Sequence, residues 1–192
     1  MADEFGEFSG DPLTRWLATK NTPDRDMELL DTFSYKDPEG RVWVAPKGRT
    51  VNGASIPEPL WALVGSPYTG DYRNASIVHD IACEEADTKP KRKAADRMYY
   101  FACRRGGCSK RQAIVQYLGV RIGAWFPLVK RWQPLTRKAT TKAEAFVQDA
   151  AAASLIGTFY EIAADVEPTI DTISIEEIEA IAEKHLSRKA KT

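Results

Sequence analysis

Apolar residues recur every three or four positions in three stretches in the middle of the chain, a spacing typical of helices with one buried face. The first stretch predicts a helix from about residue 72 to residue 86. The second predicts a helix from about 92 to 105, which a pair of glycines would end. The third opens with Ser109, a good helix cap, and ends before Pro127. These three helices are the predicted core of the fold.

Strand-forming residues lie in two short segments before these helices. Residues 27–35 and 41–45 are rich in β-forming side chains, and residues 37–40 between them have the composition of a turn, so a β-hairpin is predicted. Two segments rich in glycine and proline follow, at 46–57 and 65–70. They are predicted to be shaped loops without regular structure.

Helical composition returns after the third helix. Residues 143–166 favour a helix, and Ser174 with Glu177 forms a capping box before a last one. The fold class predicted is α+β: a small N-terminal hairpin and loop layer on an antiparallel helix pair plus a third helix, with a C-terminal helical tail. The predicted domains are a core over residues 1–137 and an acidic tail over residues 138–192.

Charge is segregated along the chain although the formal net charge is zero. Residues 89–142 hold fifteen basic residues against a single acid, whereas residues 143–183 hold ten acids and no Lys or Arg. Such a pattern indicates either a basic face for an anionic partner, such as phosphate head groups or nucleic acid, or an acidic tail that folds back on the basic part. Two independent solvated surfaces are the third alternative.

Composition narrows the classes of protein. An apolar share of 43% with five Trp, seven Tyr and seven Phe is typical of a folded chain. No apolar run is long enough to span a bilayer, and the acidic start is unlike a secretory leader. The three cysteines follow no metal-binding spacing and are interpreted as packing thiols. Two histidines are too few for a histidine-rich metal hydrolase, and His185 is interpreted as a solvated residue near a helix end.

The residues predicted to carry chemistry are His79, Asp80 and Asp96. If the first two helices form an antiparallel pair that turns at Asp87-Thr88, His79 stands eight residues before Asp87 and Asp96 eight residues after Thr88. The two side chains are then at the same height on neighbouring helices and can meet. A carboxylate on one imidazole nitrogen fixes the tautomer and leaves the other nitrogen free to act as a base.

Asp80 lies about 100° around the helix from His79, so it can face a loop. A hard cation such as calcium prefers carboxylate and carbonyl oxygens, and glycines of the two predicted loops could turn carbonyls toward it. The structural alternative is a partly buried His79 that is satisfied by Asp96, with Asp80 at the surface.

The segment Val78-His79-Asp80-Ile81-Ala82-Cys83, followed by Ala95-Asp96-Arg97-Met98-Tyr99, resembles the paired-helix core of small bacterial phospholipase A2 proteins. The resemblance implies that His79 activates a water, Asp80 holds calcium and Asp96 orients His79. Two features depart from that family. Cys83 stands where it has a tyrosine, and the disulfides of its secreted members are missing.

A longer part of the chain, from about Leu13 to Gly123, is similar to a phage and bacterial family of unestablished activity, domain-of-unknown-function family 1353. That family usually has Thr-Asp before its Gly-Ala-Ser-Ile-Pro region, whereas this chain has Val51-Asn52, which leaves an amide oxygen of Asn52 as the possible metal ligand. The residues that carry the similarity are Phe33, Tyr35, Gly40, Ala45-Pro46, Gly48, Gly53-Ala54-Ser55-Ile56-Pro57, Trp61, His79-Asp80, Asp96, Tyr117 and Arg121.

The resemblances imply two functions of different classes. One is a phospholipase-A2-like, calcium-dependent ester hydrolase that acts on phospholipid, with the basic residues holding it on an anionic membrane surface. The other is a non-enzymatic phage virion or adaptor protein, in which the His-Asp pair braces the hairpin and other virion proteins are the partners. A nucleic-acid-binding role is the weaker third hypothesis. The expected location is the host cytoplasm or the virion.

Overall fold

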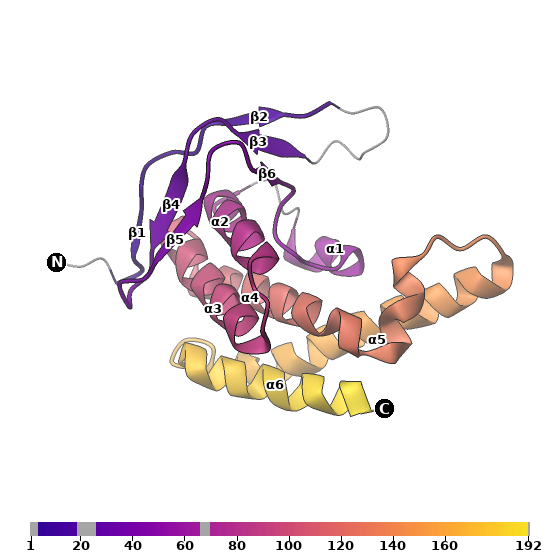
Figure 1. Cartoon of the computed structure of the whole chain (residues 1–192). Coiled ribbons are helices and arrows are strands. Elements are labelled where there is room, and N and C mark those ends of the chain that lie inside the picture. Colours follow the sequence, from indigo (N-terminus) through magenta and orange to yellow (C-terminus); the bar gives the residue numbers. More distant parts are fainter. Residues whose placement is uncertain (1–3, 19–25, 66–69, 192) are drawn as a thin grey trace. The chain divides into compact units, whose positions relative to one another are not determined.

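The structure is a computed structural model that describes residues 4–18, 26–65 and 70–191 (Figure 1). Short strands make up its N-terminal part and helices the remainder, which confirms the predicted α+β class. None of the helices within these ranges is long and apolar enough to cross a membrane.

The chain packs into two compact units. Unit 1 consists of residues 1–55 and 66–117, and unit 2 consists of residues 56–65 and 118–192. This division describes packing, whereas the predicted boundary after residue 137 concerns independent folding and stays a prediction.

Two three-stranded antiparallel sheets form the β layer of unit 1. Their strand orders are β1-β4-β5 and β2-β3-β6. Phe8 of β1 stacks on Phe33 of β4 with ring centroids 5.5 Å apart, so the first sheet has an aromatic inner face. The strands are β1 (Glu7–Phe8), β2 (Thr14–Trp16), β3 (Met27–Leu29), β4 (Phe33–Lys36), β5 (Val42–Ala45) and β6 (Thr50–Val51).

The predicted hairpin is present, but the predicted extent of its first strand is wrong. β4 and β5 pair antiparallel in the register Phe33↔Ala45, and the turn closes through a bond from the Gly40 amide to the Asp37 carbonyl. Residues 27–35 do not form one strand, because the chain bends between β3 and β4 and sends β3 into the other sheet. The segment 46–57, predicted as a loop, contains β6, which pairs with β3.

Helices α2 (Arg73–Glu84) and α3 (Lys89–Arg105) pack against each other in unit 1, and both contact the strands. The second helix begins three residues before its predicted start. Thr88 is the reason, because its side-chain oxygen accepts a hydrogen bond from the Lys91 amide and caps the helix. Pro90 lies in the first turn, where its missing N–H costs nothing. Of the predicted loop 65–70, residues 66–69 lie outside the described residues.

The third predicted helix is α4 (Lys110–Trp125). The Gln112 amide donates to the Ser109 hydroxyl, and the Gln112 side-chain oxygen accepts the Ser109 amide, which is the predicted capping box. Residues 110–117 of α4 belong to unit 1 and residues 118–125 to unit 2.

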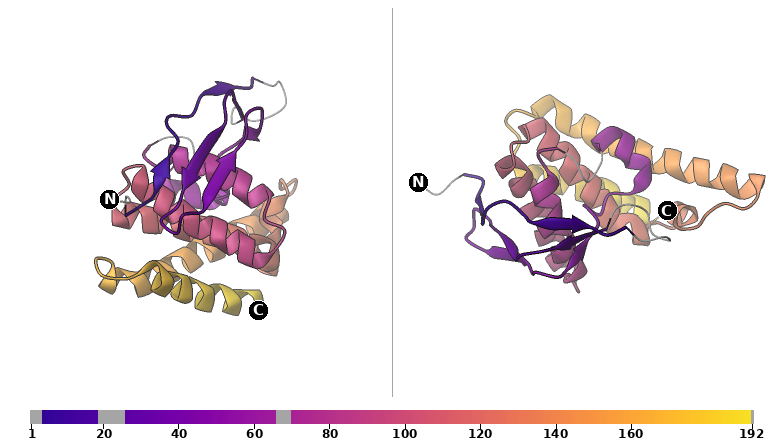
Figure 2. Two further views of the ribbon diagram at one scale, coloured as in Figure 1. Left: turned by 60° about the vertical axis from the view of Figure 1, so that its left-hand side comes forward. Right: turned by 90° about the horizontal axis from the view of Figure 1, so that it is seen from above.

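Unit 2 is helical. Helices α5 (Lys142–Val166) and α6 (Ile175–Lys191) lie side by side (Figures 1 and 2). Ser174 and Glu177 form the predicted capping box of α6. The shorter elements of this unit are η1 (Glu58–Leu60), α1 (Trp61–Val64), η2 (Phe126–Leu128), η3 (Lys130–Thr136) and η4 (Glu167–Thr169).

In unit 2, an ion pair joins the basic block (residues 89–142) to the acidic segment (residues 143–183). Arg121, from the basic block, lies 3.1 Å from Glu183, from the acidic segment, and the Arg121 side chain is only 7% exposed. This contact favours the alternative in which acidic residues of the tail fold back and pair with part of the basic block.

Candidate functional site

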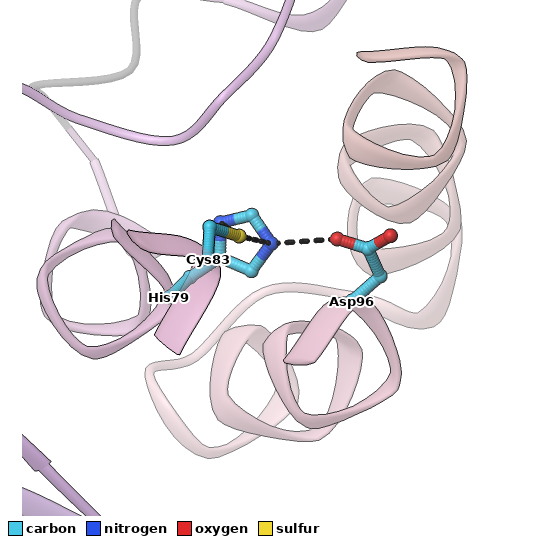
Figure 3. A group of neighbouring side chains, drawn as sticks. All are labelled: His79, Cys83 and Asp96. Atoms are coloured by element: carbon cyan, nitrogen blue, oxygen red, sulfur yellow. Dashed lines mark hydrogen bonds and ion pairs between the residues drawn. The ribbon is translucent and has the colours of Figure 1, made fainter. Parts of the chain in front are cut away.

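The predicted contact between His79 and Asp96 is the centre of the site. His79 lies on α2 and Asp96 on α3, and the His79 Nε2 atom is 2.8 Å from the Asp96 Oδ1 atom (Figure 3). The turn between the two helices leaves these residues at matching heights, as their equal sequence distance from Asp87-Thr88 predicts. Both side chains belong to unit 1 and neither is exposed to solvent.

The protonation of His79 follows from this contact. An ionised carboxylate can only accept hydrogen bonds, so Nε2 carries the proton and donates it to Asp96, and Nδ1 carries the lone pair. Burial lowers the pKa of His79 below its ordinary value, although the hydrogen bond to Asp96 opposes this shift. The ring is therefore neutral at neutral pH, with one nitrogen able to accept a proton. The ring of Tyr99 packs 4.6 Å from the imidazole centroid.

Arg92 provides the second contact of Asp96. Its Nε atom donates to the same Oδ1 atom at 3.2 Å, one helical turn away on α3. The buried carboxylate therefore has a cation beside it, as buried charges require. The sequence analysis did not identify Arg92 as a partner of Asp96.

Cys83 also contacts His79, and the sequence analysis did not predict this contact. Its Sγ atom lies 3.2 Å from Nε2 and 3.7 Å from Nδ1 of His79 (Figure 3). The spacing of four residues from His79 on one helix was the available signal, because such residues share a helix face. The thiol is partly buried, burial raises its pKa, and the Ser55 side chain makes a hydrogen bond to it.

Asp80 does face a loop, but it meets backbone amides there. The Asn52 amide donates to the Asp80 Oδ2 atom at 2.7 Å, and the Gly53 amide also bonds to this carboxyl. Gly53 has φ +96°, a conformation that side chains rarely adopt, which lets two successive amides point the same way. The Asp80 side chain is buried, so its surface position in the structural alternative is wrong.

Opposing effects act on the pKa of Asp80. Burial raises the pKa of its carboxyl to about 6, while the hydrogen bond from the Asn52 amide acts in the opposite direction. Asn52 itself is exposed, and the structure brings its backbone N–H, rather than a carbonyl, to Asp80. A calcium ion at Asp80 would therefore share the carboxylate with two amides.

Comparisons with known proteins find a family model that spans the segment containing this site. Residues 27–120 match the model of a family described as "Protein of unknown function (DUF1353)", and the segment contains His79, Asp80, Cys83 and Asp96. No solved structure matches this chain.

Two proteins of Sinorhizobium fredii are similar to this chain. The uncharacterized protein y4jT is 38% identical over 121 residues, which cover 62% of this chain and 34% of y4jT. The uncharacterized protein y4iH is 28% identical over 179 residues, which cover 84% of this chain and 72% of y4iH. The chain thus spans about a third of the length of y4jT. Residues 27–120, which contain the site, are thus similar to the DUF1353 family.

Proposed function

We propose that this chain is an ester hydrolase in which His79 acts as the general base. The observation that carries the proposal is the 2.8 Å contact between His79 Nε2 and Asp96 Oδ1. It fixes the tautomer, so Nδ1 is the atom that would take a proton from an attacking water. The lowered pKa of His79 supports the same role, because a neutral ring is the form that can act as a base.

The substrate class proposed is phospholipid, from the resemblance of the α2–α3 pair to phospholipase A2. Calcium on Asp80, with the Asn52 amide oxygen as a further ligand, would neutralise the oxyanion that forms on the ester carbonyl. Each carboxylate offers about four acceptor positions, so the amides on Asp80 leave room for a cation. The basic residues between 89 and 142 would hold the protein on anionic lipid.

The second candidate is a structural protein of a phage particle, in which the same residues brace a helical hairpin. Its supporting observation is burial, since His79 and Asp96 are both fully covered. In this hypothesis Arg92 supports the Asp96 carboxylate and Asp80 ties the 52–53 loop to α2. The partners would be other virion proteins.

Turnover of a fluorogenic phospholipid in anionic vesicles, with and without calcium, tests the first candidate. We expect His79→Gln to abolish turnover, and Asp96→Asn to lower it by a factor of about 10² or more, because each removes general-base catalysis. Asp80→Asn should remove the calcium dependence. The matched control is His185→Gln, which changes the other histidine of the chain and should leave turnover unchanged.

Melting curves of the same variants separate the two candidates. Wild-type protein that hydrolyses no phospholipid in saturating calcium, while Asp96→Asn melts at a lower temperature, would reject the hydrolase and leave the brace. Turnover that survives in His79→Gln would reject His79 as the base.

A further inference from the structure

Three side chains of different chemistry converge at the α2–α3 contact. His79, Cys83 and Asp96 each offer one ligand atom, and these atoms all lie within 4.8 Å of one another (Figure 3). We propose that they form a binding site for Zn²⁺, with a water completing the coordination. This inference goes beyond the proposed function and does not depend on it.

The geometry of the three donors is close to that of a zinc site. His79 and Cys83 are one helical turn apart on α2, and Asp96 reaches them from α3. Nε2 is 2.8 Å from Oδ1 and 3.2 Å from Sγ. Bond lengths of about 2.0 to 2.3 Å in a tetrahedral site place neighbouring donors roughly 3.3 to 3.6 Å apart. His79 Nε2 must therefore move about half an ångström away from each of the other two donors, while Sγ and Oδ1, which lie within 4.8 Å of each other, must come to the same spacing. Rotation of the Cys83 and Asp96 side chains is the movement that the proposal requires.

The donor set selects the kind of ion. A thiolate is a soft ligand that favours zinc over calcium or magnesium, and imidazole suits zinc as well. Zinc would replace the proton of the Cys83 thiol, which leaves to solvent as the sulfur–metal bond forms. At His79 the ion would bind the Nε2 lone pair, so the imidazole proton would move from Nε2 to Nδ1. With one thiolate and one carboxylate, the two charges of the ion are balanced. Three protein ligands plus a water is the pattern of zinc sites with an open position.

The residues around the site leave one side open to an ion and hold one of the ligands in place. Cys83 is partly exposed, whereas His79 and Asp96 are fully covered, so an ion would enter on the side of the thiol. Arg92 donates to Asp96 Oδ1 and orients the carboxylate, as outer residues of metal sites commonly do. Its positive charge lies beside the ion and limits the affinity.

Zinc binding and base catalysis exclude each other at this site. The ion would bind both His79 Nε2 and the Asp96 carboxylate. The hydrolase proposal needs these two groups in direct contact with each other. Metal binding is measured without substrate, so the two proposals can fail separately. Protein that binds zinc through Cys83 but hydrolyses nothing in its zinc-free form refutes the hydrolase alone, and protein that hydrolyses ester but binds no zinc refutes the metal site alone.

Cobalt substitution of the full chain tests the site directly, because a thiolate bound to Co²⁺ gives a charge-transfer band in the near ultraviolet. We expect the band in wild type and its loss in Cys83→Ser. The matched control is Cys108→Ser, which removes a buried thiol outside the group and should keep the band. In competition with a chromophoric chelator, Cys83→Ser should weaken zinc binding by more than about tenfold, since even outer-residue changes cost that much.

A second measurement uses the unaltered protein, in case Cys83→Ser does not fold. Zinc should slow alkylation of Cys83, located by peptide mapping, while calcium at the same concentration should not. Absence of the cobalt band in wild type, or a band that survives in Cys83→Ser, would overturn the proposal. Equal protection of Cys83 by calcium would also overturn it, because the donor set is argued to be selective for a soft ion.

Discussion

Each of the two histidines of this chain touches an aspartate at the same distance, yet the two pairs lie in very different surroundings. In unit 1, His79 Nε2 is 2.8 Å from Asp96, and neither side chain is exposed. In unit 2, His185 Nε2 is 2.8 Å from Asp165, with side-chain exposures of 14% and 50%. The difference between the pairs is therefore burial and not hydrogen-bond geometry.

Burial changes what the contact means physically. The Asp96 side chain is fully buried, so solvent cannot replace a lost partner, and His79 and Arg92 are two of the groups that hold its carboxylate. Around His185 the acids are open to solvent, which screens their charge and can take over their hydrogen bonds. The same His–Asp distance therefore occurs in a fully buried pair and in a partly exposed one.

The exposed pair also corrects a prediction. His185 is less solvated than predicted, with 14% of its side chain exposed, because Asp165 and Glu161 of α5 both approach its ring. The hydrogen bond from His185 lowers the pKa of Asp165, and the Lys189 side chain lowers the pKa of Glu161. Together these residues link α6 to α5 at the surface of unit 2.

The largest expected effect is that of removing the buried carboxylate. Asp96→Ala should lower the free energy of unfolding by about 1 to 3 kcal/mol, because it leaves a buried donor of His79 unsatisfied. Asp165→Ala is the matched change in the exposed pair and should have a clearly smaller effect. Denaturant unfolding of both variants measures the difference. Equal losses would show that burial does not distinguish the two pairs.

Asp80 extends the comparison to a buried acid that has no histidine partner. Asp80→Ala should free the 52–53 loop, because the carboxylate is the acceptor for the Asn52 and Gly53 amides. Hydrogen exchange at these two amides should accelerate by about fivefold or more, since one lost hydrogen bond is worth about 1 kcal/mol or more. Glu84→Ala, an exposed change on the same helix, serves as the control. Unchanged exchange in Asp80→Ala would mean that the loop holds its shape without this anchor.

The smallest expected effect concerns the exposed pair and depends on pH. The pKa of Asp165 is lowered in the folded state, so its contribution to stability is present above the ordinary carboxyl pKa and is lost as the pH falls through the lowered value. Asp165→Asn should therefore melt slightly below wild type at neutral pH, and the gap should close in acid. A gap that widens in acid would contradict the assigned direction of the shift.

The sequence by itself determined the helices and the central contact of the site. Helical periodicity and capping are local, so Ser109 with Gln112 and Ser174 with Glu177 marked the helix starts correctly. The meeting of His79 and Asp96 also follows from local spacing, because two antiparallel helices with a short turn fix which residues face each other. The spacing of four residues between His79 and Cys83 on one helix could also have predicted that Cys83 belongs to the site.

Tertiary structure alone decided the features that join distant segments. The division of residues 27–35 between two sheets depends on pairing with β1, β2 and β6, which local propensity does not encode. The amides that hold Asp80 come from a loop 28 residues earlier in the chain. The burial that separates His79–Asp96 from His185–Asp165 is set by everything packed around each pair. Local rules place a residue on a helix face, but only the packed chain determines whether water reaches it.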